Sequence, residues 1–259
     1  MSMFALSGKV AVITGSSRGI GKAIAMQMAV HGARVVISSR KAESCEAVVA
    51  EIGAAGGTAI AHAAHVGHKE ELRGLVDATV ARWGRVDVLV CNAAANPHFG
   101  PSISLTDEAL EKVIHTNLYS NIWLCNLTLP GMAERKDGAV IIISSVAGFY
   151  GTNMLGAYAV SKAADMQLAR NLAVEWGPHN IRVNCIAPGV IRTHFAKALW
   201  ADPQREAALA RRYPLRRLGE PDDVAGIAVM LAARAGNFIT GQTVVVDGGG
   251  LIGGGEPIM

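Results

Sequence analysis

Short apolar runs rich in β-branched residues alternate with longer segments of helical periodicity along the whole chain. This alternation predicts βαβ units, and therefore a parallel sheet with helices on both faces. Seven runs qualify as strands: 9–14, 34–38, 58–63, 86–91, 139–143, 181–186 and 244–247. The run 139–143 is the most apolar, as expected for a strand that is covered on both sides.

The fold class that follows is α/β, a single-domain Rossmann-type doubly wound parallel seven-stranded sheet. The chain has 259 residues and shows no repeat or linker, so residues 1–259 are expected to form one dinucleotide-binding and catalytic domain. Between the last two strands, a helical, arginine-rich insertion at about 190–218 is the expected substrate-binding part. A long helical stretch is predicted to run from about residue 101 to 135, and further helices are expected at 157–176 and from residue 221.

Composition excludes several classes of protein. Hydrophobic residues make up 51% of the chain and charged residues 17%, which excludes intrinsic disorder. The net charge is only +3, without a basic tract, so no nucleic-acid partner is expected. No apolar run reaches the ~18 residues of a membrane span, and the N-terminus lacks the pattern of a signal peptide. The four cysteines form no C-x-x-C, which predicts reduced thiols and a cytoplasmic protein.

A glycine-rich turn follows the first strand directly. Residues 14–21 read Thr-Gly-Ser-Ser-Arg-Gly-Ile-Gly, and a helix begins there. Glycines at such a turn let the backbone approach a pyrophosphate, which lies at the helix N-terminus. The alternative is a tight strand–helix turn without a ligand. The predicted contacts come from six residues, Gly15, Ser17, Arg18, Gly19, Ile20 and Gly21.

The end of the second strand predicts which coenzyme is preferred. An acid at this point would hold a free ribose 2′-hydroxyl, whereas an arginine accommodates a 2′-phosphate. The chain has Ser39 and Arg40 here and no acid before Glu43. NADP(H) is therefore the preferred coenzyme, with NAD(H) possible. The alternative is that Arg40 and Lys41 only solvate the start of a helix.

Ser145, Tyr158 and Lys162 form a Ser-x12-Tyr-x3-Lys pattern. Tyr158 and Lys162 are four residues apart on a predicted helix, so their side chains share a face. Ser145 follows the most apolar strand, where ligand crevices open in doubly wound sheets. A phenol has an ordinary pKa of about 10, and an ammonium group at ~4 Å can lower such a pKa by two or three units, into the range of acid–base catalysis.

These motifs jointly resemble the short-chain dehydrogenase/reductase family, in its compact single-domain branch, over essentially the whole chain. The resemblance rests on residues 14–21, 91–94, Asn117, 144–145, 158–162, Asn184 and 188–193. It implies hydride transfer between nicotinamide and a carbonyl or alcohol. It also implies that Tyr158 donates the proton, that Ser145 hydrogen-bonds the substrate oxygen, that Lys162 tunes Tyr158 and holds the ribose, and that Asn117 holds a water.

The resemblance further implies contacts to the ribose and nicotinamide from Asn92, Ala93, Ala94, Pro188, Gly189, Ile191 and Thr193. His65 and Val66 would meet the adenine. Two residues depart from the family pattern, because Ala94 replaces a glycine and His65 replaces an aspartate.

The predicted activity is an NADP(H)-dependent oxidoreductase acting on a carbonyl or secondary alcohol. A 3-oxoacyl-thioester reductase is the first alternative, and a non-catalytic dinucleotide sensor or scaffold is the second. An enoyl reductase would be expected to show a wider Tyr-to-Lys spacing. The arginine pairs 211–212 and 216–217 fit either an anionic carrier or a solvated helix face.

Three further expectations concern ligands and partners. His62, His65 and His68 recur every third residue, but no metal site is expected. Apolar residues expected in loops around the pocket favour an apolar substrate, with subunit contacts as the alternative for some of them: Phe99, Phe149, Met154, Phe195, Leu199, Trp200 and Tyr213. A homotetramer is implied by the resemblance and by apolar residues beyond one face of the helices that flank the tyrosine, namely Leu118, Ile122, Leu124, Leu127, Met166, Leu168, Leu172 and Val174.

Overall fold

The computed structural model describes residues 2–253, which form one parallel sheet in the order β3-β2-β1-β4-β5-β6-β7. The predicted α/β fold is confirmed. The predicted strands are each present, with ends that differ by one or two residues because the hydrogen-bonded ladders stop there. The strands are β1 Val10–Thr14, β2 Arg34–Ser38, β3 Thr58–Ala61, β4 Val88–Cys91, β5 Gly138–Ile143, β6 Ile181–Pro188 and β7 Thr243–Val246.

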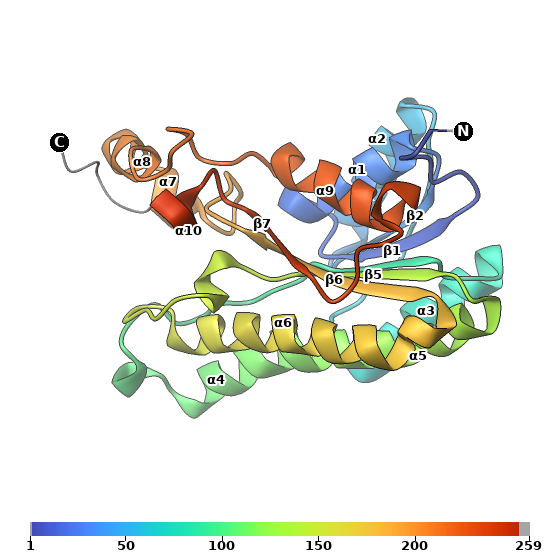
Figure 1. Ribbon diagram of the computed structural model, residues 1–259, viewed down its shortest axis with the longest axis horizontal. Coiled ribbons are helices and arrows are strands. Elements are labelled where there is room, and N and C mark those ends of the chain that lie inside the picture. The colour runs from blue at the N-terminus through green and yellow to red at the C-terminus, as the bar shows by residue number, and fades with distance from the viewer. Residues whose placement is uncertain (1, 254–259) are drawn as a thin grey trace.

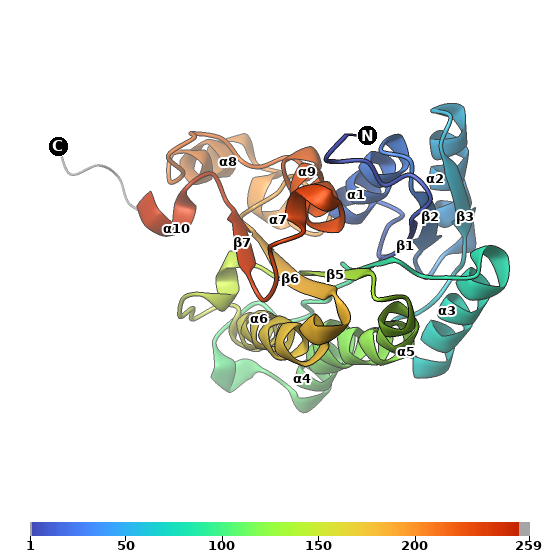
Figure 2. The same ribbon diagram turned by 45° about the vertical axis from the view of Figure 1, so that its right-hand side comes forward.

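Helices cover both faces of the sheet (Figures 1 and 2). One layer contains α1 (Gly19–Val30), α2 (Ala42–Ala54) and α9 (Pro221–Ala232), and the other contains α3 (Lys69–Trp83), α5 (Ser120–Arg135) and α6 (Gly156–Trp176). Each layer has its own apolar core against the sheet. Successive strand residues point to opposite faces, so Val12 enters one core and Ile13 the other.

The sheet reverses its order of strands at β1, which pairs with β2 on one side and with β4 on the other. In open α/β sheets, ligands bind in the crevice beyond the carboxyl ends of the strands at such a switch point. Residues that follow β1 and β4 are therefore placed to meet a ligand.

The predicted long helical stretch at 101–135 is wrong in detail. It is a short 3-10 turn (Ser102–Ser104), then α4 (Asp107–Ile114), a π-helical turn (His115–Tyr119), and α5. Thr106 starts α4, because its hydroxyl accepts a hydrogen bond from the Ala109 N–H at 3.3 Å. Regular helical periodicity does not reveal the π turn, because α4, the π turn and α5 follow one another without a break.

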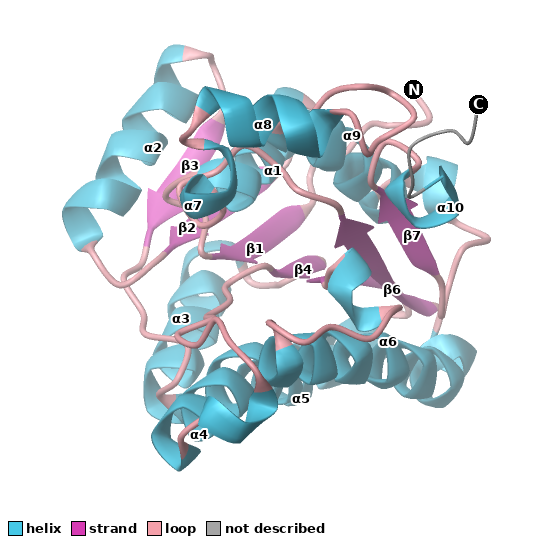
Figure 3. Cartoon of the chain, turned by 90° about the vertical axis from the view of Figure 1, so that its left-hand side faces the viewer, coloured by secondary structure: helices cyan, strands magenta, loops and turns pink. Residues whose placement is uncertain are grey.

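The insertion between β6 and β7 folds back along the carboxyl edge of the sheet. It contains α7 (Lys197–Trp200) and α8 (Pro203–Ala210), which Figure 3 shows on the opposite side of the sheet from α4. Leu199 and Trp200 therefore lie in a helical turn and not in a loop as predicted. The Trp200 indole N–H donates a hydrogen bond to the Thr193 carbonyl at 3.1 Å. The Asp202 carboxylate caps α8 by accepting a hydrogen bond from the Arg205 N–H at 2.8 Å.

The remaining short elements are α10 (Gly250–Gly253) and 3-10 turns at Val146–Gly148, Gly177–His179 and Arg234–Gly236. In the span from residue 2 to residue 253, no helix has both the length and the apolar character to cross a bilayer.

Candidate active site

The glycine turn after β1 has a conformation that other residues resist. Gly15 and Gly19 have φ angles of +64° and +56°, in the left-handed region. A Cβ added at Gly21 would lie 2.5 Å from both the Asn92 amide nitrogen and the Gly15 carbonyl oxygen. Arg18 precedes α1, and the first turn of α1 contains no acidic residue. This cradle at a helix N-terminus fits the pyrophosphate of a dinucleotide.

Asn92 joins the ends of β1 and β4. Its amide nitrogen donates to the carbonyls of Thr14 at 2.8 Å and Gly15 at 3.1 Å. The Thr14 hydroxyl in turn accepts the N–H groups of Asn92 at 3.1 Å and Ala93 at 3.2 Å. The predicted coenzyme residues after the two strands are thus held as one unit, with Ala94 next along the chain.

The corner beyond β2 and β3 holds the predicted adenosine contacts. The Ser39 hydroxyl lies 3.1 Å from the Cys45 sulfur, and Arg40 is exposed. The His65 N–H donates to the Glu71 carboxylate at 2.6 Å, while its Nδ1 accepts the Gly67 N–H at 3.1 Å. Burial, followed by the charges of His68 and Arg40, lowers the pKa of His65. The charge of Arg40 therefore acts on the His65 ring. Val66, the next residue along the chain, is half-buried.

The predicted catalytic residues meet where β5 ends against α6. The Lys162 ammonium lies 5.8 Å from the centre of the Tyr158 ring. Ser145 caps the following 3-10 turn, with its hydroxyl accepting the Ala147 N–H at 3.1 Å. The Ser144 hydroxyl donates to the Lys162 carbonyl at 2.7 Å and so ties the end of the strand to α6. Strand end and helix are thereby fixed relative to each other.

Asn117 is buried inside the π turn. Its amide oxygen accepts the Ala95 N–H at 2.8 Å, and its amide nitrogen donates to the Ala95 carbonyl and to the Ser161 hydroxyl, each at 3.0 Å. The side chain therefore clamps the loop after β4 to α6. It does not contact Lys162 directly.

A buried ion pair, absent from the sequence prediction, completes this region. Lys162 and Asp165 are 2% and 0% exposed, with the ammonium 3.0 Å from the Asp165 carboxylate and 2.9 Å from the Ile143 carbonyl. The Asn121 amide donates both to Asp165, at 2.9 Å, and to the Asn117 carbonyl, at 2.6 Å. The sequence signal was an acid three residues after Lys162, on the same face of the helix.

Burial and the ion pair act in opposite directions on Lys162. Burial is the largest influence and lowers its pKa, but Asp165, with smaller contributions from Tyr158 and Cys185, raises it, and the net result is a pKa above the ordinary lysine value. Burial also raises the pKa of Asp165.

The segment after β6 forms the opposite wall. A Cβ added at Gly189 would lie 2.9 Å from the Asp247 Cβ, and one added at Gly19 would lie 3.2 Å from the Thr193 methyl group. A cavity of about 140 Å³ opens beside Gly189 and Ile191. Phe195 of the insertion lies with its ring centre 6.1 Å from that of Tyr158. The insertion therefore reaches both the glycine turn and the tyrosine.

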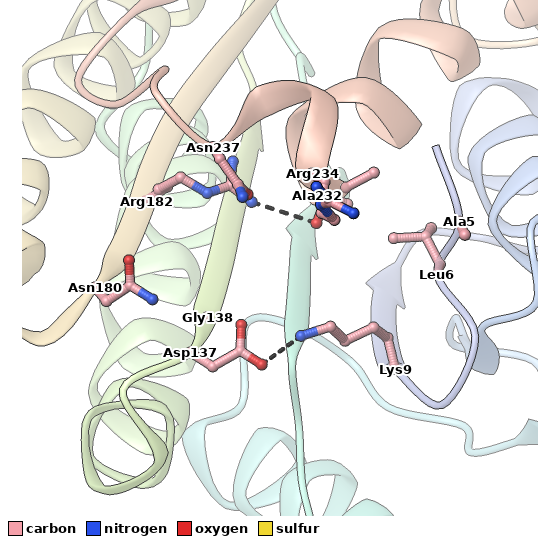
Figure 4. A pocket seen from close by; sticks show the side chains of 11 residues that line it. Ala5, Leu6, Lys9, Asp137, Gly138, Asn180, Arg182, Ala232, Arg234 and Asn237 are labelled. Carbon is pink, nitrogen blue, oxygen red and sulfur yellow. Dashed lines mark hydrogen bonds and ion pairs between the residues drawn. The ribbon is translucent and has the colours of Figure 1, made fainter. Parts of the chain in front are cut away.

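A second cavity, of about 210 Å³, lies at the amino ends of β5 and β6. It is lined by polar side chains that include Lys9, Asp137 and Arg182 (Figure 4). None of the predicted site residues lines it, so it is separate from the candidate active site. His65 and His68 stack at 4.6 Å, and no group of three potential metal ligands occurs within residues 2–253.

Comparisons with known proteins agree with this arrangement. A family model described as enoyl-(acyl carrier protein) reductase matches residues 15–250. Dehydrogenase/reductase SDR family member 4 of Sus scrofa is 44% identical over 244 residues, which cover 94% of this chain and 88% of that protein. The chain belongs to the short-chain dehydrogenase/reductase family.

Solved structures of short-chain dehydrogenases superpose closely. A 7α-hydroxysteroid dehydrogenase complexed with NADH and 7-oxo glycochenodeoxycholic acid has a TM-score of 0.92 and 36% identity, covering 99% of this chain and 98% of that chain. A gluconate 5-dehydrogenase from Burkholderia cenocepacia J2315 in complex with NADP and tartrate has a TM-score of 0.91 and 31% identity, covering 96% and 97%. The protein is accordingly an oxidoreductase of the nicotinamide-dependent type.

Proposed function

We propose that the protein is an NADP(H)-dependent oxidoreductase that interconverts a carbonyl compound and a secondary alcohol. The observation that carries the proposal is that the Lys162 ammonium lies 5.8 Å from the Tyr158 ring on α6, where the Ser144 hydroxyl ties the end of β5, just before Ser145, to the same helix. A non-catalytic sensor would need the cradle but not the acid–base group, so this set favours an enzyme over a sensor.

Each of these residues has a role that its chemistry suits. The bound coenzyme supplies or accepts the hydride. Tyr158 gives its phenolic proton to the substrate oxygen during reduction and takes it back during oxidation, while Ser145 donates a hydrogen bond to the same oxygen. The Lys162 ammonium stabilises the phenolate that remains. Asn117 contributes by holding the loop after β4 against α6.

The preference for NADP(H) is part of the same proposal. Arg40 is exposed just after β2, and its charge contributes to lowering the pKa of His65. A guanidinium binds a 2′-phosphate through paired, charge-assisted hydrogen bonds. Solved relatives include complexes with NADH and with NADP, so relatives alone do not favour either coenzyme.

Apolar substrates fit the mouth of the site better than sugar acids do. Phe149 and Phe195 are 48% and 57% exposed, and Phe195 lies beside Tyr158. Exposed aromatic rings around polar catalytic groups favour a carbonyl substrate with an apolar body. In the insertion, Arg192 pairs with Glu206 and Glu220, and Arg217 pairs with Asp223. These pairings make Arg192 and Arg217 less available for an acidic thioester carrier.

A spectrophotometric assay of NADPH oxidation tests the proposal. NADPH oxidation is followed with ketones, diketones, quinones and 3-oxoacyl thioesters, and the reverse reaction with secondary alcohols. We expect turnover of apolar ketones with NADPH favoured over NADH. Turnover confined to 3-oxoacyl thioesters would move the assignment to the thioester reductase, and coenzyme binding without any turnover would favour the sensor.

A further inference from the structure

The Lys162 ammonium is enclosed by protein. Its neighbours include the Asp165 carboxylate at 3.0 Å and the Ile143 carbonyl at 2.9 Å, and neither charged side chain is more than 2% exposed. We propose that Asp165 is a positioning residue of this site, whose carboxylate keeps the Lys162 amine charged and holds it next to Tyr158.

Among the described residues, Asp165 is the one titratable group near Lys162 that carries a negative charge. Tyr158 and Asp165 face it from α6, Cys185 from β6 and Cys91 from β4. Burial raises the pKa of Cys185, and a hydrogen bond to Cys125 together with burial raises the pKa of Cys91, so both thiols are neutral. On α5, the nearest group of this network is the neutral amide of Asn121.

Asp165 is itself held in place. Asn121 donates to its second oxygen at 2.9 Å and to the Asn117 carbonyl at 2.6 Å. The carboxylate is thus fixed between α5 and the lysine, which limits where the ammonium can lie. An amine this deeply buried without a counter-charge favours its neutral form. A neutral Lys162 would no longer stabilise a Tyr158 phenolate.

The test is the pH profile of kcat/KM for alcohol oxidation, measured for wild type and Asp165→Asn with saturating coenzyme from about pH 6 to pH 10. The variant keeps the shape of the side chain but removes its charge. We expect wild type to show no alkaline limb from Lys162 in this range. The variant should be active at the acid end and lose activity as pH rises, with its limb at least about one pH unit below the ordinary lysine pKa of ~10.4. Asp165→Glu should move the limb back to higher pH, toward wild-type behaviour.

Glu175→Gln is the matched control, because it removes an exposed carboxylate from the same helix. Its pH profile should equal that of wild type. A uniform loss of activity in Asp165→Asn at every pH, without this alkaline limb, would mean that Asp165 only packs the core and would overturn the proposal.

This inference rests on the proposed function, so a second measurement avoids turnover altogether. Urea unfolding of the coenzyme-free chain is followed between about pH 7 and pH 9.5 for wild type and Asp165→Asn. In the variant the folded pKa of Lys162 falls below its unfolded value. The unfolded state then binds more protons, and stability rises with pH. In wild type the folded pKa is raised, so no such rise occurs in this range.

The urea midpoints of the two proteins should therefore converge as pH rises. A difference that is constant with pH would contradict the role of Asp165. If no alcohol or ketone is turned over, the proposed function fails, but the unfolding experiment still decides whether Asp165 keeps Lys162 charged.

Discussion

Tyr158 can be tested by removing a single hydroxyl group. Tyr158→Phe should lower kcat by ~10²–10⁴-fold, because a positioned proton donor is lost while the ring and its packing remain. Coenzyme affinity and Tm should stay near wild type, since the cradle after β1 and Lys162 are untouched. Steady-state kinetics, coenzyme titration and thermal unfolding measure the three quantities. Near-native kcat in this variant would overturn the assigned role.

Arg40 decides the coenzyme in our proposal. Arg40→Asp replaces a cation, which suits a 2′-phosphate, by an acid, which suits a free 2′-hydroxyl. The ratio of kcat/KM for NADPH to that for NADH should fall by at least about tenfold and can invert, which corresponds to ~1.4 kcal/mol. Lys41→Asp is the control, because it changes charge at the next position. A wild-type protein that prefers NADH would refute the assignment.

Among elements, the glycine turn after β1 leaves little room for a larger side chain. Gly21→Ala would place a methyl group 2.5 Å from the Gly15 carbonyl and the Asn92 amide. Relieving that overlap should cost about 1–3 kcal/mol in stability and weaken coenzyme binding at least tenfold. The control is Gly53→Ala within α2, where nothing lies within 4 Å of the added Cβ. Equal coenzyme affinity in both variants would argue against the cradle.

The start of α9 supplies a pH-dependent contribution to stability. A hydrogen bond from Arg217, supported by the Glu220 N–H, lowers the pKa of Asp223 to about 2. A lowered folded pKa means that this stabilisation is present above the ordinary carboxyl pKa of about 4 and is lost as pH falls toward 2. Acid unfolding should therefore show wild type more stable than Asp223→Asn at pH 5, with the difference vanishing near pH 2. Asp222→Asn, in the same turn, should show no such convergence.

Some elements of the fold could be predicted from local sequence, and others could not. The strands were predictable because β-branched runs such as Val10–Thr14 leave few alternatives. The glycine turn was predictable because its glycines directly follow the first strand and open a helix in a chain of alternating β/α units. The π turn and the division of the insertion into α7 and α8 could not be predicted, because both depend on tertiary contacts. The ion pair of Lys162 and Asp165 was missed for the same reason: whether an acid three residues away faces inward depends on α5 and β6.

At the scale of the whole molecule, the predicted apolar surface for assembly is only partly available. Of the eight apolar residues named for the flanking helices, Leu124, Met166 and Leu172 are buried in the chain's own core and are not available for a partner. Val160 and Val174 on α6 are 63% and 81% exposed, and Tyr119 is 41% exposed. Covering these residues still favours association of identical chains.

A homotetramer remains our prediction for the state in solution. Light scattering at micromolar concentration should give four times the chain mass of 27.0 kDa. Val160→Lys combined with Val174→Lys should shift the mass toward smaller species while the far-ultraviolet circular dichroism stays unchanged. A monomer mass for the wild-type protein would reject the prediction. The family resemblance also implies that the C-terminal segment meets another subunit, and residues 254–259 of that segment lie outside the described residues.

The π turn at His115–Tyr119 sets the rotational phase between α4 and α5. Each residue of an α-helix advances the chain by about 100° around the axis, so one extra residue in a turn reorients everything beyond it. Deleting Leu118 would let the helix run regularly but would swing Asn121 away from Asp165. This stretch can therefore accept substitutions of side chains far more readily than a change in its length.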